Sequence, residues 1–169
     1  MLKKKIFFFL ILIFSYNTYC YANNSIAYMD FNYVINNSLI GKKMLSNLNN
    51  LNQNNIEKLK LKQKELKIEL DEINKIKNIA SKEDIQKKVS LHNTNVKDYE
   101  NLKKKLANDL NKKKNEEMNK LVELINPILE NYLKENSIDI LLNKEIVYFA
   151  KDKYDISENI ISLTNEKYK

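Results

Sequence analysis

Two segments decide the fold: residues 56–73, IEKLKLKQKELKIELDEI, and residues 85–102, IQKKVSLHNTNVKDYENL. In both segments apolar residues recur at every third or fourth position, with Lys, Glu, Asp and Asn between them. This spacing places the apolar side chains on one narrow stripe of a helix, as in the seam of a two-stranded coiled coil. The stripe extends beyond both segments and comprises Leu45, Leu48, Ile56, Leu59, Leu66, Leu70, Ile73, Ile85, Val89, Val96, Tyr99, Leu106 and Leu110.

The two helices are expected to form one long antiparallel hairpin. No Gly or Pro occurs between Lys42 and Asn126, and the whole chain of 169 residues has one of each, which argues against a turn-rich β-sandwich. The outgoing helix, 42–79, would be roughly 57 Å long at 1.5 Å per residue. A turn near 78–81 follows, where Ser81 is placed to cap the returning helix. That helix should reach about residue 135, with a kink or interruption at Pro127.

The N-terminus has the pattern of a signal peptide. Lys3, Lys4 and Lys5 precede a purely apolar run of nine residues, 6–14, and Cys20-Tyr21-Ala22 resembles a cleavage site. Nine residues are too few to span a bilayer, which needs about 20. We expect residues 1–22 to be cleaved, with a retained anchor or lipidation of Cys20 as alternatives. The processed chain of 147 residues would then lack cysteine and hold together without disulfides.

Charge is divided unevenly between the hairpin and the rest of the chain. Residues 42–120 contain 20 Lys and 12 acidic residues, a net charge of +8, whereas the remainder of the processed chain carries 6 Lys and 10 acidic residues, a net charge of −4. Basic arms could attract an acidic unfolded chain, nucleic acid or anionic lipid. A solvated coiled-coil surface explains the same charges without any partner.

Residues from both ends of the chain are expected to form a small body, 23–40 and 121–169, from which the arm, 41–120, projects with its tip near 78–82. Strands are predicted at 25–31, 138–143 and 146–150, the last two as a hairpin through Lys144-Glu145. One or two helical turns should follow Phe31, and Ser157 should cap a short final helix.

A body of 67 residues buries a marginal core, and its strands leave open edges. We therefore expect it to oligomerise. Gly41, the only glycine, predicts a bend or close packing at the root of the arm. The residues expected in the oligomerisation body are Ile26, Tyr28, Ile138, Ile140, Leu142, Val147 and Phe149.

The root of the arm is polar on both helices. Residues 47–55 read NLNNLNQNN, and the returning seam is interrupted at 111–117, NKKKNEE. If the hairpin folds about residue 80, these stretches lie at nearly the same height. They predict a hinge there, with compositional drift as the alternative.

The ends of the processed chain resemble the Skp/OmpH family of periplasmic chaperones. The resemblance rests on Ile26-Ala27-Tyr28-Met29-Asp30 with Val34 and Gly41-Lys42, on Ile138-Asp139-Ile140-Leu141-Leu142, and on Val147-Tyr148-Phe149-Ala150 and Tyr154-Asp155-Ile156-Ser157-Glu158. Ser137 stands where the family commonly has glycine, so Asn136 is expected to take the left-handed geometry instead.

This resemblance implies an α+β, mostly α fold: a long antiparallel coiled-coil hairpin inserted in a small β body that trimerises into a jellyfish-like shape. It also implies an ATP-independent periplasmic holdase that binds unfolded outer-membrane proteins between its arms and prevents their aggregation. Lipopolysaccharide or an anionic membrane surface is a further possible partner.

Client contacts are expected from apolar residues beside the seam and from lysines at the arm tips: Leu61, Ile68, Leu91, Leu102, Lys75, Lys77, Lys82, Lys87 and Lys88. Widened seams and solvated charge explain these residues equally well. His92 lies in register with the seam, and a lone histidine is most often a packing residue. With one histidine and one glycine, no catalytic triad, metal site, phosphate loop or cofactor is predicted.

Two other functions fit parts of the pattern. A structural coiled-coil protein could bridge envelope layers without any client. Nucleic-acid binding is suggested by basicity, but the chain has no Arg and its arms have few aromatics, so guanidinium contacts and stacking platforms are lacking. We therefore expect no specific nucleic-acid partner.

Overall fold

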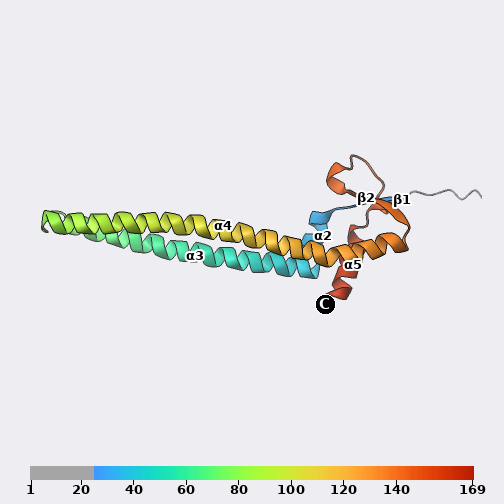
Figure 1. The fold of residues 1–169 in the computed structure, drawn as a ribbon, viewed down its shortest axis with the longest axis horizontal. Coiled ribbons are helices and arrows are strands. Elements are labelled where there is room, and N and C mark those ends of the chain that lie inside the picture. Colours follow the sequence, from blue (N-terminus) through green and yellow to red (C-terminus); the bar gives the residue numbers. More distant parts are fainter. Residues whose placement is uncertain (1–24) are drawn as a thin grey trace, which may run out of the picture.

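The computed structural model describes residues 25–169, which form a long two-helix arm with a small body at one end (Figure 1). Strand β1 (Ser25–Met29) and helix α2 (Phe31–Asn37) precede the outgoing helix α3 (Leu39–Ile76). The returning helix α4 (Lys82–Glu135) is followed by β2 (Ile138–Asn143), two 3-10 turns η1 (Lys144–Ile146) and η2 (Asp152–Tyr154), and α5 (Ser157–Lys167). The predicted signal peptide, 1–22, lies outside the described residues.

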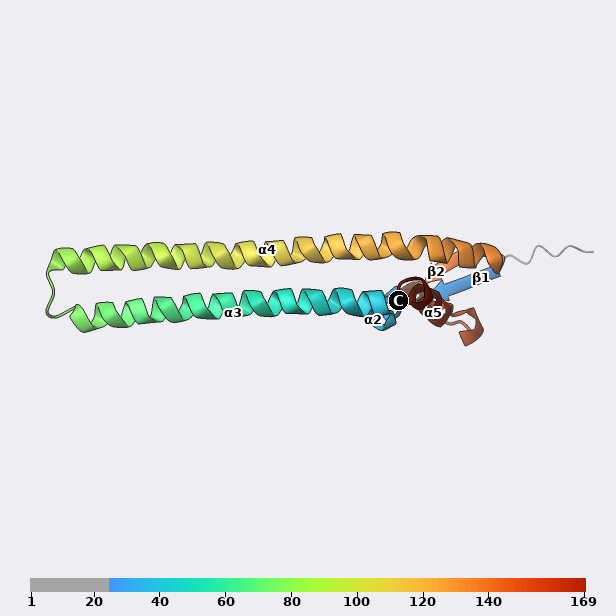
Figure 2. The same cartoon turned by 90° about the horizontal axis from the view of Figure 1, so that it is seen from below.

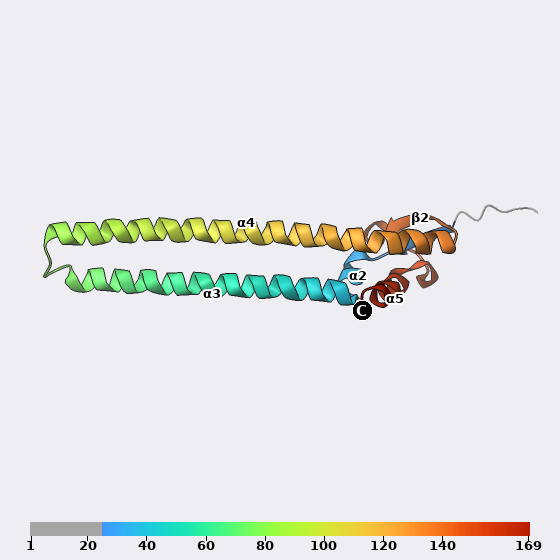
Figure 3. The ribbon, with the colours of Figure 1, turned by 60° about the horizontal axis from the view of Figure 1, so that its bottom comes forward.

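Helices α3 and α4 lie side by side from the body to the tip, as the turned views make clear (Figures 2 and 3). The predicted hairpin and its turn are therefore confirmed, with α3 ending three residues earlier than expected. Ser81 caps α4 as predicted, because its hydroxyl accepts from the backbone N–H of Asp84 at 3.1 Å. At the other end, the Ser38 hydroxyl accepts from the N–H of Gly41 and caps α3.

Gly41 is required by close packing, as its position predicted. A Cβ added there would lie 2.0 Å from the carbonyl oxygen of Ile35 and 2.8 Å from the hydroxyl of Ser38. The missing side chain thus allows the end of α2 to fold back against the start of α3. This contact fixes where the arm leaves the body.

The body core is assembled from both ends of the chain and from the root of the arm. Val34 of α2, Ile125 of α4 and Ile160 of α5 are completely buried. Two hydrogen bonds join α5 to the start of the chain. The Ser157 hydroxyl accepts from the N–H of Asp30 at 2.9 Å, and the Asn165 side chain accepts from the N–H of Leu39 at 2.7 Å. The C-terminus therefore lies beside the root of the arm (Figure 1).

The sheet differs from the predicted one. β2 pairs with β1, in parallel, with Ile26 opposite Ile140 and Tyr28 opposite Leu142. Residues 146–150 do not form the predicted strand, and Lys144-Glu145 begins a 3-10 turn instead of a hairpin. Among the described strands, β1 and β2 pair only with each other, and segment 146–150 joins neither of them as a third strand.

Two local predictions were wrong, and a third was wrong in part. Ser137, rather than Asn136, takes the left-handed conformation, with φ of 53°. Ser157 is the first residue of α5 and not its cap; its N–H donates to the carboxylate of Asp155. α4 is not interrupted at Pro127, because Ile125 and Ile128 on either side are buried, and packing outweighs the lost hydrogen bond. A kink at Pro127, the other form of that prediction, stays a prediction.

Candidate functional site

The shaft of the arm exposes apolar side chains that its own seam does not use. Leu61 and Ile68, seven residues apart on α3, share one face and are 64% and 48% exposed. Leu91 on α4 is 61% exposed. Leu102 differs, because it is half-buried and lines a shallow groove of about 210 Å³ with Leu66 and Tyr99 at the seam.

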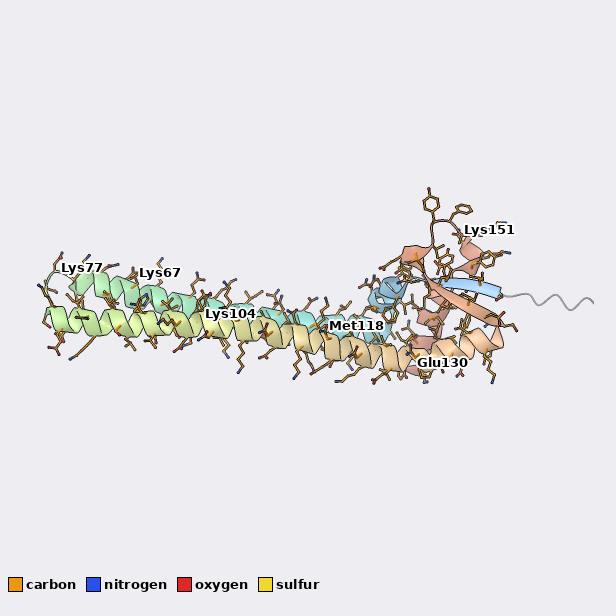
Figure 4. The ribbon with its side chains drawn as sticks, turned by 45° about the horizontal axis from the view of Figure 1, so that its top comes forward. Lys67, Lys77, Lys104, Met118, Glu130 and Lys151 are labelled. Carbon is orange, nitrogen blue, oxygen red and sulfur yellow. The ribbon has the colours of Figure 1, made fainter. Side chains whose placement is uncertain are left out.

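The lysines expected at the tip are all exposed. Lys77 lies at the end of the arm, in the turn (Figure 4). Lys87 forms an ion pair with Glu83 at 3.0 Å, whereas no ion pair within 4.0 Å is formed by Lys75, Lys82 or Lys88 in the described part of the chain. The tip thus presents mostly free cationic side chains to solvent.

Sequence reasoning missed two exposed features of the arm. Ile79, in the turn, is 84% exposed among the tip lysines. On the shaft, a shallow groove of about 470 Å³ is lined by Lys60, Gln63, Lys64, Lys67 and Leu70. The spacing of Lys60, Lys64 and Lys67 could have revealed it, since residues four and seven apart share a helix face.

One polar cluster joins the two helices of the arm. The carboxylate of Glu69 on α3 accepts from the Asn95 amide at 2.9 Å and contacts Nδ1 of His92 at 3.1 Å, both on α4. The hydrogen bond from Asn95, followed by that from His92, holds the pKa of Glu69 below its ordinary value. His92 is a seam residue, as predicted, with its side chain only 14% exposed.

The polar stretches at the root meet at one end. Asn47 and Glu117 line the same groove, of about 510 Å³, between the start of α3, α4 and the end of α5. Glu117 pairs with Lys113 at 3.0 Å and Lys120 at 3.2 Å, and these bonds, Lys113 first, lower its pKa. Both helices continue through this height, and the predicted hinge stays a prediction.

The body residues expected in oligomerisation divide into two sets. Tyr28 is buried and Ile138, Leu142 and Val147 are half-buried. Ile26, Ile140 and Phe149 are exposed, and beside them Tyr148 has no cover at all, at 105% of its reference exposure. A groove of about 410 Å³ between β1 and the 147–154 segment is lined by Ile26, Leu142, Val147, Phe149 and Tyr154, among others.

Within residues 25–169, no three His, Cys, Asp or Glu side chains gather as metal ligands would. Over the same residues, no helix combines the length and the hydropathy needed to cross a membrane.

Known proteins share the sequence pattern and the fold of this chain. Residues 25–163 match the family model described as outer membrane protein (OmpH-like). No curated protein matches the chain. Among solved structures, one similar chain is a candidate outer membrane chaperone (OmpH-like) from Caulobacter crescentus, with a TM-score of 0.79 and 12% sequence identity over 85% of each chain. At that identity the structural match shows a shared fold alone.

Proposed function

Because the chain belongs to the OmpH-like family, we propose that it is an ATP-independent periplasmic holdase, which binds unfolded outer-membrane proteins and prevents their aggregation. The observation that carries the proposal is the set of exposed apolar residues on a long basic arm, Leu61, Ile68 and Leu91. Neither the seam nor the body core needs these side chains. Catalysis forms no part of the proposal, and no cofactor is required.

The working form of the protein is a homotrimer in which three bodies join and three arms surround a cavity. Support comes from the open apolar surface of the body, where Tyr148 and Phe149 are almost fully exposed and segment 146–150 lacks a strand partner. Covering a Phe or Leu side chain contributes about 1.5–3 kcal/mol, so a few such residues from each copy would stabilise the association. Ile26 and Ile140, about half exposed on the paired strands, extend the same surface.

Client is held by many weak contacts. Leu61, Ile68, Leu91 and Leu102 contact apolar segments, while lysines attract an acidic chain. Once one arm holds the client, the effective concentration of the other arms near it rises to the millimolar range. Three arms together therefore bind far better than one. Release needs no ATP, because folding of the client into a membrane removes it from the cavity.

The tip lysines form a separate site for anionic surfaces. Lys75, Lys77, Lys82, Lys87 and Lys88 are exposed and steer acidic clients, lipopolysaccharide or an anionic membrane to the mouth of the cavity. Such attraction weakens as salt rises, because exposed charges are screened within about 10 Å at 0.1 M ionic strength. Export by the signal peptide, 1–22, would bring the protein to these partners.

Suppression of aggregation tests the function. A β-barrel outer-membrane protein diluted from urea should remain soluble at one trimer per client, measured by light scattering. Leu61→Ser/Ile68→Ser/Leu91→Ser should weaken suppression severalfold, and Lys151→Ser, on the body (Figure 4), is the matched surface control. If the unmodified protein leaves scattering unchanged, the chaperone proposal fails and a structural role in the envelope replaces it.

A further inference from the structure

Glu69, His92 and Asn95 occupy a distinctive place in the arm. Within residues 25–169, the side-chain hydrogen bonds that join α3 to α4 are the two made by Glu69. One carboxylate uses both oxygens, and its two partners lie one helical turn apart on the facing helix. The ion pairs of the shaft lie within a single helix, as in Lys62–Glu65.

The apolar seam by itself distinguishes registers poorly. Leu59, Leu66 and Ile73 on α3 are spaced by seven residues, and Ile85, Tyr99 and Leu106 on α4 fall on the same repeat with His92. Sliding one helix past the other by seven residues would again bring apolar side chains together. The short turn at the tip and the body core at the root, where Met44 and Leu121 are buried, oppose such a slip at the two ends of the arm, so a slip would require helix residues near the turn to unwind.

The polar cluster removes this ambiguity. In a register shifted by seven residues, Glu69 would face Ile85 or Tyr99 in place of His92, and its carboxylate would lose both partners in the seam. The Glu69 side chain is 37% exposed and could turn to water, but the His92 side chain is only 14% exposed, and its Nδ1 would be left without a partner. A polar group left unsatisfied in such a place is costly, whereas a satisfied one is nearly neutral. A single polar position in a coiled coil specifies register for the same reason.

The cluster lies beside the most tightly packed part of the distal arm. Of the arm residues 41–120, Gly41, Met44 and Ile73 are buried, the first two at the root, so Ile73 is the one residue near the tip that packs as tightly. The cluster lies next to it, one turn toward the body. The part of the arm beyond residue 66 is thus joined by both an apolar and a polar contact, while stretches 47–55 and 111–117 at the root contain few apolar groups.

We propose that Glu69, His92 and Asn95 form a register clamp, which fixes the alignment of α3 and α4 and keeps the distal arm closed while bending is left to the polar root. The clamp acts whether or not the arm binds client. His92 serves through its Nδ1–H, the tautomer that donates to the Glu69 carboxylate. Asn95 orients the same carboxylate from one turn further along α4.

Distance measurement between spin labels tests register directly. Gln63→Cys and Asn101→Cys lie on exposed sites of the two helices, and the processed chain, which begins after residue 22, has no other cysteine. Labelled chains are diluted with unlabelled ones, so that only distances within one chain are read. The parent should give one narrow population. Glu69→Leu/His92→Leu should add populations displaced by a helical turn or more, and Glu65→Leu should not.

Hydrogen exchange provides a second test, in which the variants keep a polar side chain at the substituted position. Glu69→Gln should raise exchange of the distal arm, 62–73 and 89–99, about tenfold, whereas Glu65→Gln, which removes the same charge one turn away, should change it less than twofold. A single unshifted distance population in the double leucine variant, or equal exchange in the two glutamine variants, would overturn the clamp. Either result would leave the chaperone proposal untouched.

Discussion

The arm and the body are held together in different ways. In the body, Val34, Ile125 and Ile160 are completely buried and come from three helices. Beyond the root of the arm, Ile73 alone among residues 45–120 is buried, at 8% exposed. Two helices facing each other can bury only a stripe, whereas several elements can enclose a core. Each core residue of the body is therefore more tightly enclosed than a seam residue of the arm, whose packing is spread thinly along the whole contact between α3 and α4.

The largest effect expected from this contrast is loss of a core side chain. Ile160→Ala should destabilise the protein by about 3–4 kcal/mol, because the site is enclosed and cannot collapse around the missing atoms. Ile73→Ala is the matched change in the arm and should cost less than half as much. Thermal unfolding followed by circular dichroism compares them, and equal losses would contradict the division between body and arm.

Gly41 sits at the junction of the two regions. Gly41→Ala should destabilise the protein by roughly 2–3 kcal/mol, because the new Cβ would overlap the carbonyl of Ile35, a backbone atom that cannot rotate away. Leu61→Ala is the control on the exposed shaft and should cost under about 0.5 kcal/mol. Urea unfolding measures both, and a Gly41→Ala variant as stable as the parent would show that α2 can shift freely against α3.

Acid should weaken the arm through Glu69. Its pKa is lower in the folded protein than in the unfolded chain, so it contributes stability above the unfolded pKa of about 4.3 and loses it as pH falls through the lower folded value. His92 and Lys62 are the charged or titratable groups that lower this pKa. The difference in melting temperature between the parent and Glu69→Gln should therefore shrink from pH 5 towards pH 3, and a constant difference would contradict the assignment.

The smallest expected effect is a gain in stability from a substitution in the body. Ser137 holds φ of 53°, a conformation that costs a residue with a side chain more than it costs glycine. Ser137→Gly should stabilise the protein by about 0.5–1 kcal/mol. Asn136→Gly, at a φ of −99°, is the control and should be neutral or destabilising. Chemical unfolding resolves the two, and a loss of stability in Ser137→Gly would contradict it.

The arm could be predicted from the sequence because its structure is local. The apolar repeat, the Ser81 cap and the absence of glycine and proline act within a few residues, so each helix follows from its own segment. The close packing at Gly41 could also be predicted from the nearby sequence, because a lone glycine between helix formers indicates such packing.

The sheet could not be predicted because its pairing joins the two ends of the chain. Residues 138–143 and 146–150 both have strand composition and lie next to each other, which favours a hairpin by local rules. Parallel pairing of β2 with β1 depends instead on the path of the whole arm, which returns the chain to its starting point. Tertiary packing likewise decided the continuity of α4 at Pro127.

The exposure of most candidate client-binding residues could be predicted, whereas their contacts could not, and their role stays a prediction. Exposed apolar residues such as Leu61 and Leu91 follow from their place off the repeat, whereas Leu102 lies closer to the seam than its spacing suggested. The partners of His92 were not predicted, because a contact between Glu69 and His92 requires the register of the hairpin to be known first.

The mass of the processed protein in solution tests the central claim most directly, since the proposed trimer would cover Tyr148 and Phe149, which the single chain leaves exposed. Sedimentation equilibrium at micromolar concentration should give three times the mass of one chain. Phe149→Asp should lower that mass and also lower the temperature at which the protein unfolds. A stable, fully folded monomer would contradict the account, because a single arm encloses no cavity.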